Sequence, residues 1–484
     1  MKDNAYPDLE LLIDGRWFGA EATRDALPVM NPATGATLGQ LPMATTDDVH
    51  AAIDAAARAF PAWRSTPALD RCSLLQRIAG LIRRDMEALC RVLTLEQGKT
   101  LKESRGELTS TADTFEWMAE EAKRVYGRVV PARTRMTEQI VLREAVGPVG
   151  AFAPWNYPAV LSARKIAPAL AAGCTVVIKP AEETPGILVS IARLCVEAGV
   201  PPGVLNVVFG NPGSTSEYMI DSPLIRHLSF TGSVPVGRHL AALAGKALKK
   251  ITLELGGHSA AIVCADADLD RVAEMSVAAK FRNAGQICHS PARFFVHESI
   301  HDAFLSRFAE RAKALRVGNG IQDDVQMGPL IHARRKAAVE QLTQDALDRG
   351  AKLVCGGASH ADGGAGHFWK PTVIANADRG SLAMQEEIFG PLALITPFSS
   401  LDDAIAQANS TQYGLAAYGF TKSAESMFTL QHELQAGSIA FNTYAISSPE
   451  MPFCGLKDSG LGVESGPEGL SEYLDVKSVI KSFT

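Results

Sequence analysis

The 484-residue sequence has no C-x-x-C pair, no long apolar run and no large excess of charge of one sign. Its eight cysteines stand singly, which excludes a zinc ribbon and fits a reducing compartment better than a disulfide framework. Most of them are therefore expected to be buried, inert thiols. The histidines are scattered too, so the sequence predicts no bound metal.

The missing apolar runs and the small net charge exclude two further classes of protein. No run approaches the ~18–20 residues that span a bilayer, and the stretch Met1–Pro7 lacks the basic start and apolar core of a secretory signal. With 47 basic and 53 acidic side chains the net charge is −6, whereas a surface that binds nucleic acid is basic. We expect a cytoplasmic protein that contacts neither membrane nor nucleic acid.

What the sequence does contain is a regular alternation of helices and apolar strands. Residues 46–122 are predicted to form long amphipathic helices, with helical spacing of apolar side chains in Asp47–Phe60 and Arg71–Leu93. From residue 149 onward, short strands alternate with helices. The predicted strands are Val149–Ala153, Cys174–Ile178, Leu205–Val208, His227–Phe230 and Ile251–Leu253, and the helices are Ala159–Ala172, Gly186–Ala198, Ser214–Ile220 and Val236–Ala247. Four such units predict a parallel sheet covered on both faces.

A second series of strands and helices follows, from Ala260 to about Phe441. Its predicted strands are Ala260–Val263, Phe294–Val296, Leu353–Cys355, Leu392–Phe398 and Tyr418–Phe420. Two lobes of this kind should meet in a cleft, and ligands bind outside the carboxyl ends of parallel strands. Two strand-like stretches, Gly127–Glu144 and Tyr473–Phe483, fit neither lobe and are expected to form an arm that pairs with another subunit.

Two motifs at predicted strand ends suit a dinucleotide. The run Phe230–Gly237 passes from a strand into a helix, where free backbone N–H groups attract phosphate. An ordinary helix cap explains this run equally well, since it is neither G-x-G-x-x-G nor a Walker loop. Lys179 and Glu182 follow another strand of the same sheet, and their charges suit the hydroxyls of a ribose. Together the two motifs favour a dinucleotide site.

Cys288 and Glu254 are the candidate reactive side chains. Cys288 lies in the polar run Phe281–Ser290, so we expect an accessible thiol, unlike Cys264 and Cys355, whose neighbours are apolar. A free thiol titrates at about 8.5, and its reaction at neutral pH needs a nearby positive charge, dipole or base. Glu254 interrupts an apolar strand, where burial would raise its pKa toward that of a general base. A hydrogen-bonded structural glutamate is the alternative.

Two apparent motifs are rejected. The run Asp266–Asp270 opens like a calcium loop, but Arg271 stands where glycine is required and Val277 where the last acid is required. Its acids are expected to cap the following helix instead. His289 is the immediate neighbour of Cys288, and neighbours in sequence point apart, so the base must come from elsewhere in the fold.

In this order and at these intervals, the motifs resemble those of NAD(P)-dependent aldehyde dehydrogenases, over about Leu11–Ser482. The matching runs are PWN at 154–156, KPAE at 179–182, GS at 232–233, ELGG at 254–257, GQIC at 285–288 and EIFGP at 387–391. The resemblance implies an aldehyde-dehydrogenase-like α/β fold that assembles as a homodimer or homotetramer. Its expected parts are a Rossmann-type NAD-binding domain (1–126 and 146–255), an α/β catalytic domain (256–446), and a small β oligomerisation arm with the C-terminal segment (127–145 and 447–484).

The resemblance also implies a role for each matched residue. Cys288 would attack the aldehyde as a thiol of low pKa, Asn156 and the Cys288 N–H would hold the oxyanion, and Glu254 would activate the water that hydrolyses the thioester. Lys165 and Glu464 match positions proposed for proton relay. The residues implied to bind the cofactor are Trp155, Lys179, Glu182, Gly232, Ser233, Leu255, Glu387 and Phe389.

Four of the matched positions narrow the choice of cofactor and of substrate. The Glu182 carboxylate would repel the 2′-phosphate of NADP, so NAD is favoured, with NADP as the alternative. Arg164, Arg282 and Ser447 match the positions with which succinate-semialdehyde dehydrogenases hold the far carboxylate of the substrate, and forked guanidinium donors suit that group. Structural ion pairs of the two arginines are the alternative.

Several alternatives stay open. Residues 450–453 and 457–460, together with 124–128, also resemble 2-oxoglutarate-semialdehyde dehydrogenases. Succinic, glutaric and 2-oxoglutaric semialdehydes, a sulfonated analogue and broad specificity therefore all remain. The presence of Glu254 argues against a CoA-acylating enzyme. The presence of Cys288 and Asn156 as well as Glu254 argues against a non-catalytic binding protein. Ser290 stands where some succinate-semialdehyde dehydrogenases have a second cysteine, two places after the nucleophile, so the disulfide switch of those enzymes is not expected here. Cys454 has no assigned role.

Overall fold

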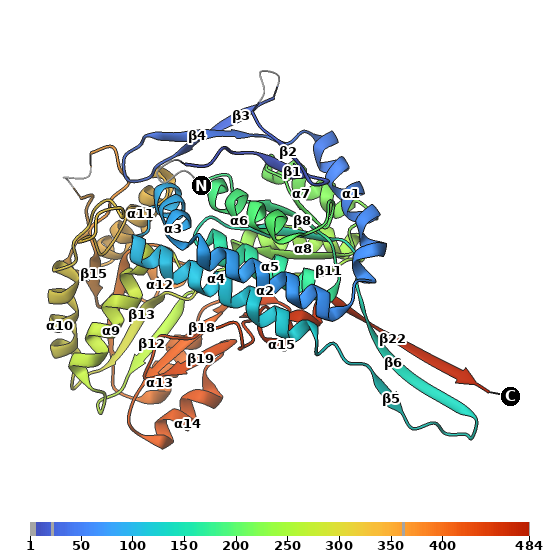
Figure 1. Ribbon diagram of the computed structural model, residues 1–484. Coiled ribbons are helices and arrows are strands. Elements are labelled where there is room, and N and C mark those ends of the chain that lie inside the picture. Colours follow the sequence, from blue (N-terminus) through green and yellow to red (C-terminus); the bar gives the residue numbers. More distant parts are fainter. Residues whose placement is uncertain (1–5, 21–23, 361–363, 484) are drawn as a thin grey trace.

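Two β-sheets, each covered by helices, form the two lobes of the computed structural model, which describes residues 6–20, 24–360 and 364–483 (Figure 1). The first sheet has the order β2-β1-β9-β8-β7-β10-β11-β21, and its five central strands are parallel. Its strands are β1 (Leu11–Ile13), β2 (Arg16–Phe18), β7 (Val149–Ala153), β8 (Val176–Pro180), β9 (Leu205–Val207), β10 (His227–Thr231), β11 (Lys250–Glu254) and β21 (Gly460–Leu461). All five predicted strands are present. The antiparallel edge strands β1, β2 and β21 were not predicted.

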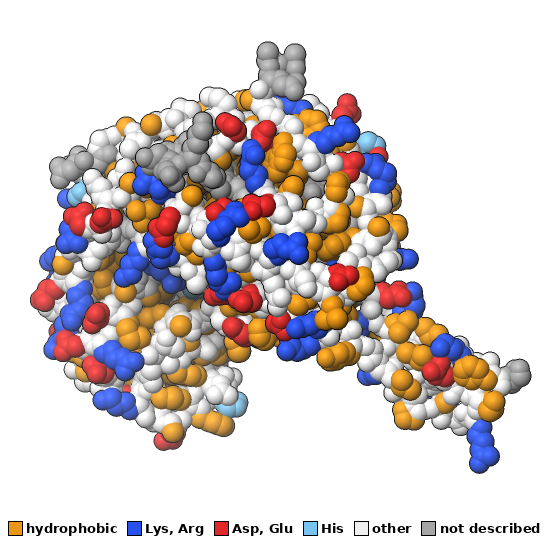
Figure 2. Space-filling view, in the orientation of Figure 1, with side chains coloured by type: hydrophobic (Ala, Val, Ile, Leu, Met, Phe, Trp, Pro, Cys, Tyr) orange, Lys and Arg blue, Asp and Glu red, His pale blue; other side chains and the backbone are white. Residues whose placement is uncertain are grey.

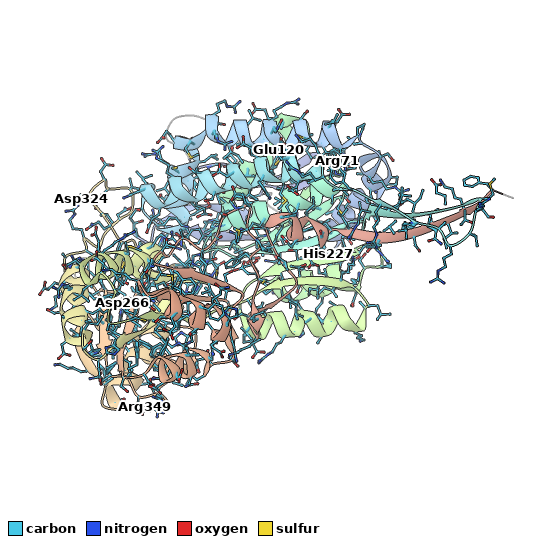
Figure 3. All side chains as sticks on the ribbon, turned by 90° about the horizontal axis from the view of Figure 1, so that it is seen from below. Arg71, Glu120, His227, Asp266, Asp324 and Arg349 are labelled. Atoms are coloured by element: carbon cyan, nitrogen blue, oxygen red, sulfur yellow. The ribbon has the colours of Figure 1, made fainter. Side chains whose placement is uncertain are left out.

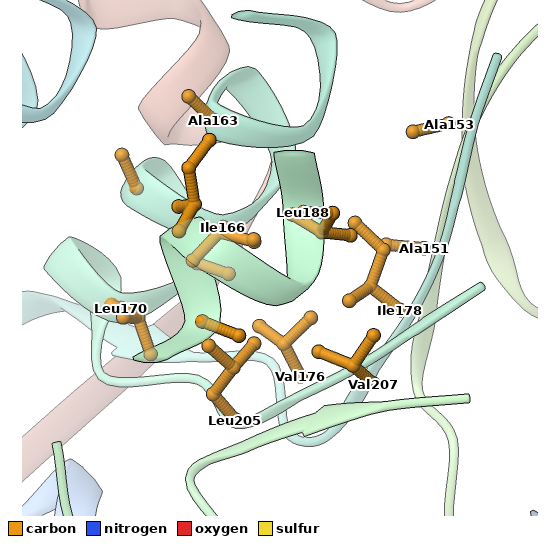
Figure 4. Close-up of a cluster of buried hydrophobic side chains, with 14 of the residues drawn as sticks. Ala151, Ala153, Ala163, Ile166, Leu170, Val176, Ile178, Leu188, Leu205 and Val207 are labelled. Atoms are coloured by element: carbon orange, nitrogen blue, oxygen red, sulfur yellow. The ribbon is translucent and has the colours of Figure 1, made fainter. Parts of the chain in front are cut away.

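Helices cover both faces of the first sheet. They are α1 (Thr46–Arg64), α2 (Ala68–Arg84), α3 (Met86–Gln97), α4 (Leu101–Ala122), α5 (Pro158–Ala172), α6 (Pro185–Ala198), α7 (Pro212–Asp221), α8 (Val234–Lys246) and α15 (Gly466–Ser471). Figure 4 shows Ile166, Leu170 and Leu188 of α5 and α6 against Val176 and Ile178 of the sheet, all of them fully buried. Burial of this apolar surface stabilises the lobe that positions half of the site.

One prediction is wrong: a stretch expected to form a single helix is divided into two. The run 71–93 forms the separate helices α2 and α3, because the backbone at Asp85 (φ −98°, ψ 16°) leaves helical geometry. Aspartate is a weak helix former, since its side chain competes for nearby hydrogen bonds. Here the Asp85 carboxylate pairs with the guanidinium of Arg84.

The second sheet has the order β14-β15-β16-β13-β12-β18-β19, with β14 as its antiparallel edge strand. Alternate residues of β12 belong to different apolar clusters, Ala261 and Val263 to one and Ala260 and Ile262 to the other, so both faces are buried. The strands are β12 (Ser259–Val263), β13 (Pro291–His297), β14 (Lys352–Cys355), β15 (Thr372–Ala375), β16 (Leu392–Phe398), β18 (Ala416–Phe420) and β19 (Ser438–Phe441). The helices are α9 (Leu269–Phe281), α10 (His301–Lys313), α11 (Ala333–Asp348), α12 (Leu382–Gln385), α13 (Leu401–Asn409) and α14 (Ala424–Glu433). Strands β15 and β19 were not predicted.

The two segments expected to form an arm pair with each other. Strands β5 (Arg128–Val130), β6 (Thr137–Ala145) and β22 (Leu474–Ser482) form an antiparallel sheet of order β22-β6-β5 that projects away from both lobes (Figure 1). Apolar side chains gather on this projection (Figure 2). Those that are more than half exposed are Tyr126, Val129, Met136, Val476, Ile480 and Phe483. That the arm pairs with another subunit stays a prediction.

The C-terminal segment also returns to the body of the molecule. Strand β20 (Leu456–Lys457) pairs with β17 (Tyr413–Gly414), and β21 pairs with β11, which ends at Glu254. A hairpin of β3 (Ala26–Met30) and β4 (Thr37–Pro42) was not predicted. Among the described residues, no helix combines the length and the apolar character needed to cross a bilayer. The proposed domain boundaries stay predictions.

Candidate active site

The predicted site residues meet where the two lobes join. In the first sheet the strand order reverses at β7, so the crevice outside the carboxyl ends of β7 and β10 is a topological switch point. Residues 154–156 follow β7, and Gly232 and Ser233 follow β10. From the second lobe the Glu387 carboxylate enters this region, where its Oε1 accepts a hydrogen bond of 3.1 Å from the N–H of Gly257.

Cys288 and Glu254 come from different lobes and lie close enough that each side chain influences the pKa of the other. Cys288 is half-buried in the loop before β13, and Glu254 is buried at the carboxyl end of β11. Burial, followed by repulsion from Glu464, raises the pKa of Glu254, as predicted. The expected low pKa of the thiol is wrong: burial and the adjacent Glu254 carboxylate raise the pKa of Cys288 well above its usual value. The thiol is therefore protonated at neutral pH, with the Glu254 carboxylate as its neighbour.

A buried chain of polar groups leads away from Glu254. The Thr231 hydroxyl donates to Glu254 Oε2 at 3.2 Å and accepts from Lys165 Nζ at 2.8 Å. Lys165 Nζ also forms an ion pair of 2.6 Å with Glu464 and a hydrogen bond of 3.3 Å with Ser229. The structure thus brings together the two residues matched to a proton relay. Thr231 was missed, and its place at the end of β10 gave no signal of this role.

Asn156 is buried beside the loop that carries Cys288. Its Nδ2 donates to the carbonyl of Gln286 at 3.1 Å, and no described acceptor takes its second amide hydrogen. The loop is held in the left-handed region at Asn283 (φ 50°), Ala284 (φ 51°) and Gly285 (φ 72°). This hydrogen bond joins the Asn156 amide to the loop two residues before Cys288.

The residues predicted to hold the adenosine and pyrophosphate lie at strand ends of the first sheet. The ammonium of Lys179 pairs with the Glu182 carboxylate at the end of β8 and donates to the carbonyl of Pro180 at 3.2 Å. Ser233 begins α8, and no described side chain caps the first turn of this helix, so its N–H groups are open to an anion. Leu255 packs against Gly237 in this same turn. These groups fit a dinucleotide.

The residues predicted for the nicotinamide end are also neighbours. The rings of Trp155 and Phe389 lie edge to face with 5.5 Å between centroids, and Phe389 has a left-handed backbone (φ 43°). A Cβ atom added to Gly256 would lie 2.5 Å from the Glu387 carboxylate, so this carboxylate lies directly against the Gly256 backbone. Burial raises the pKa of Glu387 to about 7. His332, whose ring centroid is 6.0 Å from that of Trp155, was missed by the sequence analysis.

Arg164 and Arg282 provide unpaired positive charge, and Ser447 contacts the first of them. Arg164 donates to the Ser447 hydroxyl and lies over the Phe453 ring, and its buried Nε has no partner. In the part of the chain that is described, no carboxylate lies within ion-pair distance of either Arg164 or Arg282, and Arg282 is exposed. Two guanidinium groups without counter-charges can accept an anionic ligand.

The structure also tests the rejected motifs. Asp268 caps α9 by accepting from the N–H of Arg271 at 3.3 Å, as expected. Asp266 accepts from the Thr421 hydroxyl at 2.9 Å, within the second lobe (Figure 3). The described residues hold no group of three or more potential metal ligands. The His289 ring packs against Phe453, with 6.0 Å between ring centroids, and its Nδ1 lies 3.4 Å from the Tyr418 hydroxyl.

Of the other cysteines, five are buried, including Cys355 as expected. Cys264, which was expected in the core, is only half-buried, because it lies just past the end of β12. Cys454 is also half-buried, and nothing in the structure assigns it a function.

Comparison with known proteins assigns the family. Residues 17–479 match the aldehyde dehydrogenase family, to which the chain belongs. A 4-(hydroxymethyl)benzenesulfonate dehydrogenase of Comamonas testosteroni is 48% identical, with 97% of each chain covered. The succinate-semialdehyde dehydrogenase [NADP(+)] of Escherichia coli (strain K12) is 42% identical, covering 97% of this chain and 96% of the relative. A solved betaine aldehyde dehydrogenase from Staphylococcus aureus, in complex with NAD+, is 33% identical with a TM-score of 0.95, covering 98% and 94%.

The family assignment settles the class of reaction. The protein is an oxidoreductase that acts on aldehydes with NAD or NADP as the acceptor. These three relatives act on substrates that differ in size and charge, so family membership alone leaves the aldehyde open.

Proposed function

We propose that the protein oxidises a short aldehyde carrying an anionic group to the corresponding acid, through a covalent intermediate on Cys288. The arrangement that carries the reaction is the buried Glu254 carboxylate beside the Cys288 thiol: the pKa of Glu254 is raised, and its Oε1 has no hydrogen-bond partner among the described residues. As the sulfur attacks the carbonyl carbon, Glu254 takes the thiol proton and the Asn156 amide stabilises the oxyanion. When bound, the dinucleotide supplies the acceptor for the hydride that oxidation removes.

Glu254 then acts a second time, on water. The thioester on Cys288 is hydrolysed by a water molecule whose proton passes to Glu254, which releases the acid and restores the thiol. Glu254 returns the water proton to the departing thiolate, so the proton that must leave the site is the one first taken from the thiol. The chain of Thr231, Lys165 and Glu464 offers that earlier proton a route away before water is activated. A base beside the thiol favours water over CoA as the acceptor of the acyl group.

The test of this mechanism is NADH formation by purified protein with a panel of aldehydes. Cys288→Ala should abolish it, and Glu254→Gln should lower it. Addition of CoA should leave the rate and the product unchanged, because the product is the free acid. Persistent turnover by Cys288→Ala would refute the mechanism, and an inactive wild type would favour a non-catalytic binding protein.

For the cofactor we propose a preference for NAD over NADP. The Glu182 carboxylate lies at the end of β8 beside Lys179, where an adenosine ribose would be held, and repels a 2′-phosphate. The E. coli relative is named for NADP(+), so the comparison leaves both cofactors open. The measurement is kcat/KM for each cofactor with one aldehyde.

For the substrate we propose that Arg164, Arg282 and Ser447 bind a carboxylate, with succinic semialdehyde or a close analogue as the aldehyde. The unpaired guanidinium groups and the orphaned Nε of Arg164 support this. A sulfonate is the second candidate, because the relative from C. testosteroni is named for a sulfonated substrate. Glutaric and 2-oxoglutaric semialdehydes have the same terminal group and stay alternatives.

The substrate test compares succinic semialdehyde, 3-sulfopropanal and butanal. The wild type should prefer one of the two anions, and Arg164→Ala/Arg282→Ala should lose that preference while keeping its rate with butanal. The control is Arg349→Ala, which removes an exposed guanidinium of the second lobe that pairs with Asp345 (Figure 3). Equal rates of the wild type with all three aldehydes would show broad specificity.

We also propose that the protein assembles through the arm and acts in the cytoplasm. The exposed apolar side chains of the arm would be buried by a second copy of the chain. Light scattering measures whether dimers or tetramers form.

A further inference from the structure

A buried ion pair lies directly behind the predicted oxyanion donor. Lys99 and Glu107 are fully buried, and the Lys99 ammonium lies 2.5 Å from Glu107 Oε2. The neighbouring residues explain this placement. Gly98 ends α3 in the left-handed region (φ 94°), and Thr100 begins α4, so Lys99 is fixed between two helices. Burial of either charge without the other would cost free energy.

The Lys99 ammonium contacts the backbone of Asn156. Its Nζ donates to the Asn156 carbonyl at 2.8 Å and lies 3.6 Å from the centroid of the Tyr157 ring. Glu107, one turn further along α4, accepts from the N–H of Ala159 at 2.8 Å with its other oxygen, at the start of α5. The pair therefore holds the turn between β7 and α5 from both sides.

The same turn is tied to the loop that carries the thiol. Asn283 Nδ2 donates both to the Asn156 carbonyl at 3.1 Å and to the Gln286 carbonyl at 3.2 Å. The Gln286 carbonyl is also the acceptor of the Asn156 side chain. Lys99 and Asn283 thus meet at a single carbonyl oxygen, which connects the two halves of the site.

From this geometry we infer that Lys99, held by Glu107, is a positioning residue for the reaction: it fixes the Asn156 amide relative to the Cys288 sulfur. This rests on the proposed function, because it assumes that Asn156 stabilises the oxyanion. The ammonium has two acceptors and an aromatic face, which satisfies its three donors in one orientation. An ordinary packing residue would not need a charge at this point.

The test uses a pair of substitutions that leaves no lone buried charge. Lys99→Met/Glu107→Gln keeps the side-chain volumes and an acceptor for the N–H of Ala159. We expect kcat to fall by about 100-fold, the size expected for a displaced catalytic donor, with KM for the aldehyde and the affinity for NADH changing little. The control is Glu96→Gln, since Glu96 also is a buried carboxylate that caps a helix, α6, without touching Asn156.

A double-mutant cycle separates positioning from general stability. If Lys99 acts through Asn156, the substitutions at 99 and 107 should have less than about a 3-fold effect on kcat in an Asn156→Ala background. The inference would be overturned if the fold-losses of kcat caused by the 99/107 substitutions and by Asn156→Ala multiplied in the combined variant. It would also be overturned if Glu96→Gln lost as much kcat as the 99/107 variant. Melting temperatures of all variants show whether each one is folded, and a Lys99→Met/Glu107→Gln protein that is folded and fully active also overturns it.

A second substrate distinguishes failure of the positioning role from failure of the proposed function. p-Nitrophenyl acetate is an activated ester whose attack by a thiol passes through an oxyanion and needs no cofactor. The burst of p-nitrophenolate should fall in the 99/107 variant and in Asn156→Ala to the same extent. If the wild type shows this burst but oxidises no aldehyde, the proposed function fails and the positioning role stands. If it oxidises aldehydes but the variant retains the full burst, the positioning role fails.

Discussion

Substitution of Thr231 by valine should shift the pH dependence of turnover. Valine keeps the shape of the side chain but removes the hydroxyl that donates to Glu254 Oε2 at 3.2 Å. A hydrogen bond to a charged group contributes about 1.5–3 kcal/mol. At 3.2 Å this bond is longer than the usual 2.7–2.8 Å for two oxygens, so we take about 1.5 kcal/mol, which corresponds to about one pKa unit.

The direction of the shift follows from which form of Glu254 the hydroxyl stabilises. The pKa of Glu254 is already raised by burial and by Glu464. The Thr231 hydroxyl stabilises the carboxylate, so its removal raises the pKa further. Glu254 is a base only when ionised, and activity is lost as the pH falls through its pKa. The acidic limb of kcat against pH should therefore move to higher pH by about one unit.

The assay is NADH formation with saturating aldehyde across the pH range in which the protein is stable. Thr252→Val is the matched control, because Thr252 is a buried threonine of β11 whose hydroxyl lies 3.5 Å from His227 Nε2. Its acidic limb should match that of the wild type. An unmoved limb in Thr231→Val, or one displaced to lower pH, would refute the role given to this hydrogen bond.

Three further outcomes are expected. Glu182→Ala should raise kcat/KM with NADP relative to NAD by at least about 10-fold, since the repulsion of the 2′-phosphate is lost, as measured by initial rates with each cofactor. Gly232→Ala should weaken NADH binding in a fluorescence titration, because the added Cβ would strike the ring of Phe230 at the predicted pyrophosphate turn; an unchanged affinity would move the pyrophosphate elsewhere. Ile480→Asp, at a side chain that is 69% exposed on the arm, should lower the mass measured by light scattering, and full retention of the wild-type mass would exclude β22 from the subunit contact.

The sequence predicted the centre of each lobe better than its edges. The strands β7 to β11 are short apolar runs between helices, and this pattern directly reflects a sheet buried on both faces. The edge strands β1, β2 and β21 are only two or three residues long, and they exist because a distant partner strand offers free hydrogen-bonding groups. Local patterns carry no information about such partners.

The same limit applies to the site. Cys288, Glu254 and Asn156 were found because each stands in a motif, and the structure brings them together. Thr231 and Lys99 were missed, since an ordinary threonine at a strand end and a lysine between helices become significant only through contacts made by the fold. The pKa of the thiol was wrongly predicted because burial and an adjacent carboxylate depend on the other lobe.

The pairing of β21 with β11 has a consequence for assembly. Gly460 lies opposite Glu254, and the chain then supplies Glu464, passes through α15 and becomes β22, an edge strand of the arm. The last part of the polypeptide thus borders Glu254 at one end and carries part of the apolar surface of the arm, at Val476, Ile480 and Phe483, at the other. If copies of the chain associate through the arm, one continuous segment joins that contact to the surroundings of Glu254, so we expect dilution to single chains to slow proton transfer although every reacting group is still present.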